Sequence, residues 1–179
     1  MSDLKDNKNN LEILISTINN SSLDFINNIL KNNIGCLYPI LVVNQSKNEL
    51  QSNQNNIRVI NLNSIGLSKS RNTAIQNSSS DLCIFCDDDI VYKKNFYNVI
   101  KTAFKENIDA DVITFQIENE HGQLFKDYEN LKYHNKKSIK KVNSVTIALK
   151  ENLLFQIKLN LILYLGWGQP LKLEMNICF

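Results

Sequence analysis

Three consecutive aspartates follow an apolar run of strand length in LCIFCDDDIV, residues 82–91. Adjacent side chains leaving a strand point in alternate directions, so Asp87 and Asp89 are expected to face one way and Asp88 another. Two carboxylates that face one way are hard oxygen ligands, which suit Mg²⁺ or Mn²⁺ with water and phosphate completing the shell. The alternative interpretation is a solvated acidic turn that stabilises the start of the next helix.

Alternating apolar runs and helical spacings supply the elements that must position these aspartates. We expect strands at 11–17, 38–44, 57–62, 82–86, 111–117 and 142–149, and helices at 21–33, from about 67, and at 94–107. This alternation predicts an α/β doubly wound sheet. Ligands of such sheets bind outside the carboxyl ends of the strands, and the aspartates follow such an end.

Composition narrows the class of protein. The 179 residues are 43% hydrophobic and 21% charged, which suits one domain or slightly more with a buried core. A net charge of +2 does not favour a nucleic-acid partner. Residues 1–10 are polar and are expected to be a disordered tail without a secretory signal, and no uncharged stretch is long enough to span a bilayer. The four cysteines show no disulfide framework, which predicts a reduced, cytoplasmic protein.

Residues 66–92, GLSKSRNTAIQNSSSDLCIFCDDDIVY, resemble a signature of family-2 glycosyltransferases. Members show a Gly-Leu-Ser turn, a helix bearing Arg-Asn, a small-polar stop ending in Asp, an apolar strand and then Asp-x-Asp. LEILISTIN at 11–19 also resembles the family's first strand, which runs into Thr-x-Asn. The resemblance covers roughly 11–155. It implies a Rossmann-like GT-A nucleotide-diphospho-sugar transferase fold, with a mixed, mostly parallel sheet and helices on both faces, incomplete at the C-terminus.

The same resemblance implies roles for the site residues. It implies a nucleotide-diphosphate sugar donor, a polysaccharide or lipid-linked glycan acceptor, and Mg²⁺ or Mn²⁺. Asp87 would contact the donor ribose or the metal, and Asp89 would ligate the metal. The other residues implied to bind the donor are Ser16, Thr17, Asn19, Asn44, Gln45, Lys69, Arg71 and Asp88.

Two of these assignments have open alternatives. Arg71, with Lys69 nearby, would hold base or phosphate, because a guanidinium fork suits phosphate geometry; a surface ion pair with an acid is the other interpretation. Asn44 and Gln45 stand where the family usually carries an acidic residue after the second strand. An amide can still hydrogen-bond a base edge.

The stretch that would carry the general base is not found in this sequence. An inverting transferase needs a base to deprotonate the acceptor hydroxyl, and family members supply it in a stretch resembling F-D-x-x-F-G-x-G…G-E/D-D/E. Here Glu174 is the one carboxylate after Glu151. AT-rich codons from Lys158, shifted by two nucleotides, permit IKFDTLSGLGTTFKAGDEYLF. We therefore expect a transferase domain over 11–157 and an out-of-frame tail over 158–179, which leaves this chain with little turnover.

Three functional alternatives remain at this point. The chain could be a non-catalytic nucleotide-sugar-binding remnant or module, or a phosphotransfer protein with an acidic pocket. The apolar run LNLILYLGWG in the tail could be a short interfacial segment with Trp167 at the headgroup level. At most peripheral contact with the inner face of a membrane is expected.

Other residues have side chains that could react or bind ligands, but we interpret them as structural or as solvent-exposed. Cys83 and Cys86 have metal or redox spacing, but at a separation of three the thiols face opposite sides of a strand, so we expect buried small hydrophobes. His121 is expected at the tip of a turn over 118–123. The lysine-rich excursion at 125–141 is interpreted as a solvated face, with contact to an anionic acceptor or membrane as the alternative.

Overall fold

The structure, a computed structural model, describes residues 10–128, 131–135, 137–151 and 175–177. The predicted disordered tail, apart from Asn10, and the predicted out-of-frame tail, apart from 175–177, lie outside these residues. The strands and α-helices up to β6 follow the predicted order: β1 (Leu11–Thr17), α1 (Phe25–Ile29), β2 (Ile40–Asn44), β3 (Ile57–Asn61), α2 (Leu67–Gln76), β4 (Leu82–Asp87), α3 (Phe96–Glu106), β5 (Val112–Thr114) and β6 (Ile147–Lys150). The 3₁₀ turns η1 (Ile139–Lys141) and η2 (Ser144–Thr146) and the strand β7 (Met175–Ile177), which lies in the predicted out-of-frame tail, were not predicted.

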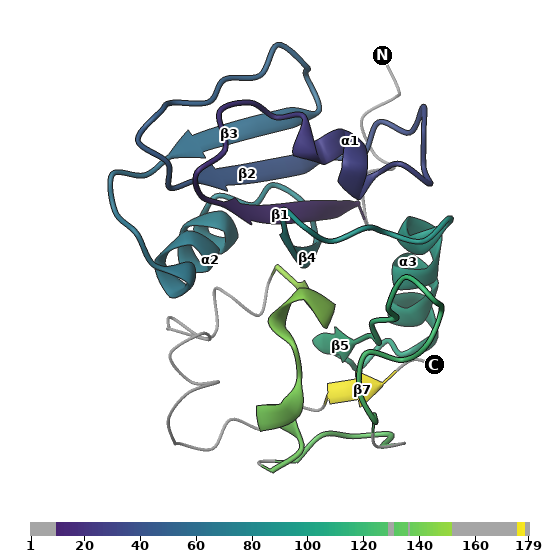
Figure 1. Ribbon diagram of the computed structural model, residues 1–179. Coiled ribbons are helices and arrows are strands. Elements are labelled where there is room, and N and C mark those ends of the chain that lie inside the picture. The colour runs from purple at the N-terminus through teal and green to yellow at the C-terminus, as the bar shows by residue number, and fades with distance from the viewer. Residues whose placement is uncertain (1–9, 129–130, 136, 152–174, 178–179) are drawn as a thin grey trace, which may run out of the picture.

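The described strands form one sheet in the order β3-β2-β1-β4-β6-β5-β7 (Figure 1). β1 pairs in parallel with β2 and β4, β2 with β3, and β5 with β7. Only β6 runs antiparallel to its neighbours β4 and β5 among these strands. The predicted mixed, mostly parallel sheet is therefore confirmed. Because β1 to β4 are parallel, their carboxyl ends lie at one edge.

Helices cover both faces of the sheet, as predicted. Alternate side chains of β1 point to opposite faces: Ile13 and Ile15 pack with the buried residues of α1 and α3, whereas Leu14 packs with Ala74 and Ile75 of α2. Figure 1 shows α2 apart from α1 and α3. This two-sided burial explains why the strand sequences are nearly continuous apolar runs.

Three elements are much shorter than predicted, whereas the others differ by three residues or fewer. The helix predicted over 21–33 is confined to Phe25–Ile29, because Asn32 and Asn33 donate side-chain hydrogen bonds to the main-chain oxygen of Tyr92 instead of continuing it. The strand predicted over 111–117 ends at Thr114, and a hairpin follows. The strand predicted over 142–149 begins only at Ile147, because Thr146 bonds back to the main-chain oxygen of Asn143 and closes a turn.

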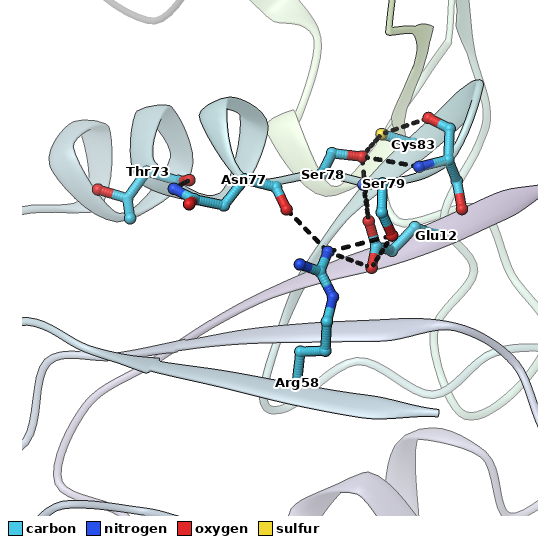
Figure 2. A network of polar contacts seen from close by, with 8 residues as sticks. Glu12, Arg58, Thr73, Asn77, Ser78, Ser79 and Cys83 are labelled. Atoms are coloured by element: carbon cyan, nitrogen blue, oxygen red, sulfur yellow. Dashed lines mark hydrogen bonds and ion pairs between the residues drawn. The ribbon is translucent and has the colours of Figure 1, made fainter. Parts of the chain in front are cut away.

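A buried carboxylate ties the connection between α2 and β4 to the sheet (Figure 2). Glu12, 1% exposed on β1, accepts hydrogen bonds from Arg58 Nη2 at 2.8 Å, Ser78 Oγ at 3.0 Å and the Ser79 amide at 2.8 Å. Arg58 Nη2 also donates to the main-chain oxygen of Asn77, which caps α2. This network lies at the amino end of β1 and anchors α2 from the edge opposite the aspartates.

Candidate functional site

The predicted site residues gather at the carboxyl edge of β1, β2 and β4. Asp87 is the last residue of β4, and Ser16 of β1 is its register partner. Thr17 ends β1 beside Asn44, which ends β2. We use the name carboxyl-edge site for the residues that meet around these strand ends: Ser16, Thr17, Asn20, Arg71, Asp87, Asp88 and Asp89.

A buried arginine reaches this edge from α2. Arg71 Nη2 donates to Asp87 Oδ1 at 2.9 Å, and the two side chains are 5% and 37% exposed. The guanidinium carbon of Arg71 lies 5.7 Å from the centroid of the Phe85 ring. Its Nε is buried and makes no hydrogen bond within the described residues. The site therefore contains a guanidinium that is shielded from solvent and whose Nε–H has no hydrogen-bond acceptor among the described residues.

Asp88 turns to the other side, toward the end of β1. Its Oδ2 accepts hydrogen bonds from Thr17 Oγ1 at 2.5 Å and from Asn20 Nδ2 at 2.7 Å. Asn20 Nδ2 also lies 2.6 Å from Thr17 Oγ1. Asp87 thus contacts α2, whereas Asp88 contacts the end of β1 and the loop that follows it.

Asn20 is a site residue that the sequence pattern missed. The Thr-x-Asn resemblance pointed to Asn19, which is exposed and has φ of 63°. Asparagine tolerates this left-handed conformation better than most residues, and the chain turns there. The turn brings the side chain of Asn20 to Asp88. Nothing in two adjacent asparagines distinguishes the one that makes this contact.

Asp89 lies beyond the end of the strand. The Ile90 amide bonds to the main-chain oxygen of Asp87 at 3.3 Å, so the chain turns after Asp87 and strand alternation no longer decides where Asp89 points. Asp89 is exposed and makes no hydrogen bond or ion pair in the described part of the chain. Its carboxylate is therefore available to a ligand from solvent.

The described residues contain no group of three or more His, Cys, Asp or Glu side chains placed to hold a metal ion. A site of two carboxylates, as expected for Asp87 and Asp89, has a smaller protein ligand set. Mg²⁺ accepts such a site when substrate phosphate and water supply the other oxygens.

Two of the remaining predicted residues, Ser16 and Asn44, make hydrogen bonds to neighbouring elements and loops at this edge. Ser70 Oγ donates to the buried Ser16 Oγ at 2.8 Å and so joins α2 to β1, a role for which the sequence pattern gives no signal. Asn44 is fully buried, and its Nδ2 donates to the main-chain oxygen of Asn48 and to Asn61 Oδ1, both at 2.8 Å. Its amide organises the loop between β2 and β3.

Gln45 and Lys69 lie on either side of the turn that starts α2. Gln45 Nε2 donates to the main-chain oxygens of Ser64 and Gly66, at 2.6 Å and 3.1 Å. Gly66 has φ of 145°, a conformation that side chains disfavour, as the predicted glycine turn requires. Lys69 is exposed, one turn of the chain after Gly66. Gln45 thus holds the turn in place, and the side chain of Lys69 is accessible to a ligand.

The cysteine and histidine interpretations are confirmed for the described residues. Cys83 and Cys86 are buried in the two opposite faces of the sheet. Burial raises the pKa of each thiol to about 12, and for Cys86 the nearby carboxylates of Asp87, Asp89 and Asp88 add to the rise. His121 lies in an exposed turn. These thiols are structural and take no part in the carboxyl-edge site.

None of the helices in the described part of the chain has the length and apolar character that crossing a membrane requires.

Comparison with known proteins gives a family and a fold. The profile of Glycosyl transferase family 2 matches residues 13–158. No curated protein matches the sequence. The crystal structure of S. aureus TarS 1-349 is similar with a TM-score of 0.61 and 17% identity, over 82% of this chain and 48% of that chain.

Two further similar structures contain ligands. S. aureus TarS 1-349 in complex with UDP-GlcNAc has a TM-score of 0.62 and 19% identity, over 82% of this chain and 47% of that chain. The same protein in complex with UDP has a TM-score of 0.59 and 18% identity, over 82% and 48%. The chain spans about half the length of these structures. Their likeness confirms the predicted GT-A fold.

Proposed function

The chain belongs to glycosyl transferase family 2, and on that premise we propose that its carboxyl-edge site binds a nucleotide-diphosphate sugar for transfer to a glycan acceptor. The observation that carries this proposal is the buried guanidinium of Arg71, whose Nε lacks a partner among the described residues while Nη2 holds Asp87. A buried donor of this kind is costly unless a ligand satisfies it. Family membership disfavours the phosphotransfer alternative.

Different residues at the carboxyl edge would bind different parts of the donor. Arg71, with the exposed Lys69 beside it, offers charged donors to base or phosphate. Ser16, Thr17 and Asn20 would border the donor at the end of β1, where Asp88 holds Thr17 and Asn20. Asn44 and Gln45 act by shaping the loops that border the base, since their amides bond to those loops.

Asp87 and Asp89 would hold Mg²⁺ or Mn²⁺. Their carboxylate oxygens are the hard ligands that these ions prefer, and Asp89 makes no competing contact within the described residues. When bound, the ion would neutralise the negative charge that develops on the departing diphosphate. Arg71 orients the Asp87 carboxylate for this role through the bond to Oδ1.

The acceptor in this proposal is a growing polysaccharide or a lipid-linked glycan. The free cysteines among the described residues, Cys36, Cys83 and Cys86, suit a reducing compartment. We therefore place the enzyme in the cytoplasm, with at most peripheral contact with a membrane through its exposed lysines. The transferase domain occupies 11–157 in this proposal.

The general base is the open part of the mechanism. The family stretch that carries it does not occur in this sequence, and 158–174, where it would lie, is outside the described residues. We expect this chain to bind donor but to transfer sugar slowly, as a nucleotide-sugar-binding remnant would. Reading the coding DNA across codons 150–179 in all three frames tests the out-of-frame tail, and no open continuation in another frame would refute it.

Calorimetric titration of the full chain with UDP, with and without Mg²⁺, tests the donor proposal. We expect metal-dependent binding that Asp87→Asn and Asp89→Asn each weaken about tenfold, the effect of one lost charge-assisted contact. Asp109→Asn, at an exposed carboxylate outside the site, is the matched control and should bind as the unaltered chain does. A UDP affinity that changes neither with Mg²⁺ nor with these two substitutions would overturn the proposal. Sugar transfer from UDP-GlcNAc at rates typical of enzymes would overturn the expected slow turnover.

A further inference from the structure

A pocket with a cavity volume of about 40 Å³, partly open to solvent, lies beyond the end of β5, apart from the carboxyl-edge site. Its wall is built from the residues that follow β5, from the second limb of the hairpin, and from the segment that leads through η1. These are three separate stretches of the lysine-rich excursion and its approach, and they converge on one cavity. Most of its accessible surface is apolar, and the polar residues along its wall include Gln116, Lys126, Asp127, Tyr128, His134 and Lys141.

The sheet register places this pocket beside the aspartates. Ala148 of β6 pairs with Ile84 of β4 on one side and with Ile113 of β5 on the other. β4 and β5 therefore run in the same direction, and Thr114 lies level with Phe85 two strands away. At the usual strand spacing this separation is roughly 10 Å. The residues that follow the two strands, which form the pocket and the aspartate triplet, leave the same edge of the sheet.

An ion pair links the two regions directly. Lys93, in the loop that follows the aspartates, pairs with Glu118 at the base of the hairpin. This contact, at the surface, joins the hairpin to the loop that follows Asp87, Asp88 and Asp89. A group held in the pocket would thus be a neighbour of a group held at the carboxyl-edge site.

A partly buried ammonium gives the pocket a positive character. Lys126 Nζ donates to the main-chain oxygen of Lys141 and, at 3.0 Å, to Asn143 Oδ1, and lies 5.3 Å from the centroid of the Tyr128 ring. These two bonds use two of its three donors. Burial lowers the pKa of Lys126, because the charged form loses solvation, and an anion nearby would offset that loss. Lys141 adds a second positive side chain, against one carboxylate from Asp127.

The rest of the lining suits a hydroxyl-rich ring. Tyr128 is fixed because its hydroxyl oxygen accepts a bond from the Ile117 amide at 2.9 Å. His134 is held between Thr114 Oγ1 at 3.0 Å and Ser138 Oγ at 3.1 Å. A fixed aromatic ring offers an apolar face to the carbons of a sugar, and the Asp127 carboxylate offers acceptors to its hydroxyls.

We propose that this cavity is an acceptor pocket, which binds a sugar unit bearing an anionic group and presents it to the donor at the carboxyl-edge site. The proposal rests on the proposed function and names the chemistry of its acceptor. In the pocket, Lys126 and Lys141 pair with the anionic group, Tyr128 packs against the ring, and Asp127 accepts hydrogen bonds from ring hydroxyls. Membrane lipid is the competing source of anionic groups, and its binding is one outcome of the test.

The test is a titration of the full ¹⁵N-labelled chain, followed by NMR, with glucose 6-phosphate, glucose and inorganic phosphate. We expect glucose 6-phosphate to shift amides of 114–116 and 126–142, and to bind at least tenfold more tightly than glucose or phosphate alone, since both parts of the ligand contribute. Phosphate binding as tight as that of glucose 6-phosphate would overturn the sugar assignment. Binding to vesicles containing phosphatidylserine, without binding to the sugar phosphate, would overturn the pocket in favour of a membrane contact.

Matched variants locate the ligand. Lys126→Met should weaken glucose 6-phosphate about tenfold, the effect of losing one charge-assisted bond, and Lys140→Met, at an exposed lysine outside the lining, should change nothing. Lys141→Met preserves the main-chain oxygen that holds Lys126, so it tests the charge even if Lys126→Met loosens the loop. Asp127→Asn should weaken the sugar phosphate but not inorganic phosphate. Equal affinities in all four variants would refute the pocket.

A UDP titration of the same samples separates this proposal from the donor proposal. UDP binding should be unchanged in Lys126→Met and Lys141→Met. If UDP binds and glucose 6-phosphate does not, the acceptor pocket alone is wrong. If glucose 6-phosphate binds as expected and UDP does not, the donor proposal fails and the pocket stands as a sugar-phosphate site.

Discussion

Arg71 of α2 and Asp87 of β4 meet 2.9 Å apart, with the arginine almost entirely buried and the aspartate open to solvent. The pair joins a cation that is shielded from water to an acid that a ligand can reach. Such an arrangement favours a bound anion near Arg71 and a bound cation near Asp87, which are the two charges of a metal–diphosphate group.

The two arginines of the chain, Arg58 and Arg71, allow a matched test of this arrangement. Arg71→Met should weaken UDP binding by about tenfold or more, since a charged hydrogen bond in a shielded site is lost. Arg58→Met, at the opposite edge, should leave UDP affinity unchanged while lowering the free energy of unfolding by about 2 kcal/mol, because Glu12 loses its partner. Calorimetry and urea unfolding measure the two effects. Equal loss of UDP affinity in both variants would contradict a specific role for Arg71.

The buried carboxylate of Glu12 is expected to dominate local stability. Glu12→Gln replaces Oε1 or Oε2 with an amide nitrogen, which cannot accept the bonds from Arg58 and Ser79. We expect a loss of about 2 kcal/mol in the free energy of unfolding, measured in urea. Glu106→Gln, at an exposed glutamate, is the control and should stay within about 0.5 kcal/mol. A Glu12→Gln chain as stable as the unaltered one would show that the network contributes nothing.

The neighbouring asparagines after β1 should behave differently. Asn20→Ala removes the donor that Asp88 and Thr17 share, so we expect UDP affinity to fall severalfold as the β1 loop loosens, from a lost bond of about 1 kcal/mol. Asn19→Gly should leave UDP affinity intact, because glycine adopts the positive φ of that position readily. Titration of both variants with UDP and Mg²⁺ decides the question. The reverse ranking would place Asn19 in the site and remove Asn20 from it.

Alkali should destabilise the fold through its buried thiols. The pKa of Cys83 and of Cys86 is raised from 9.0 to about 12 in the folded chain, so both thiols stay protonated there while an unfolded chain releases their protons above pH 9. A raised folded pKa contributes stability that is complete below pH 9 and is lost as pH climbs toward about 12. The free energy of unfolding should fall by about 1.4 kcal/mol per pH unit for each thiol in that range.

Urea unfolding of the full chain at several pH values between 8 and 11 measures this slope. Cys86→Ala should reduce the slope of unfolding free energy against pH by about 1.4 kcal/mol per pH unit, the contribution of one thiol. Cys36→Ala, at an exposed thiol, should leave it unchanged and serves as the control. Identical slopes in the three chains would mean that the buried thiols do not set the alkaline limit.

The fold was predictable because its signals are local. Each central strand is a short apolar run, and burial on both faces needs no knowledge of its partners to be recognised. The shorter α1 and β6 were not predictable to the residue. Asn32, Asn33 and Thr146 satisfy main-chain groups of neighbouring turns, and those bonds depend on where distant loops arrive.

The candidate site was predictable in its composition and only partly in its contacts. The aspartates are recognisable in the sequence as three consecutive acids after an apolar strand, and the family resemblance predicts Arg71 and Thr17 as further site residues. The contribution of Ser70 and Asn20 has no such signal, because a serine on a helix and one asparagine among many look ordinary until Ser16 and Asp88 lie beside them. The hydrogen bonds from Asn44 and Gln45 to nearby loops likewise depend on where those loops lie in the folded chain.

The sequence by itself determined the alternation of strands and helices, the position of the acidic triplet after a buried strand, and membership of the family, since each depends on residues close together in the chain. Tertiary structure alone decided which asparagine reaches Asp88, that Arg71 is buried against Asp87, and that the end of β5 and two later stretches of chain line one pocket. These contacts join residues from different elements. Their geometry follows from how the sheet and its helices pack, which no short stretch of sequence encodes.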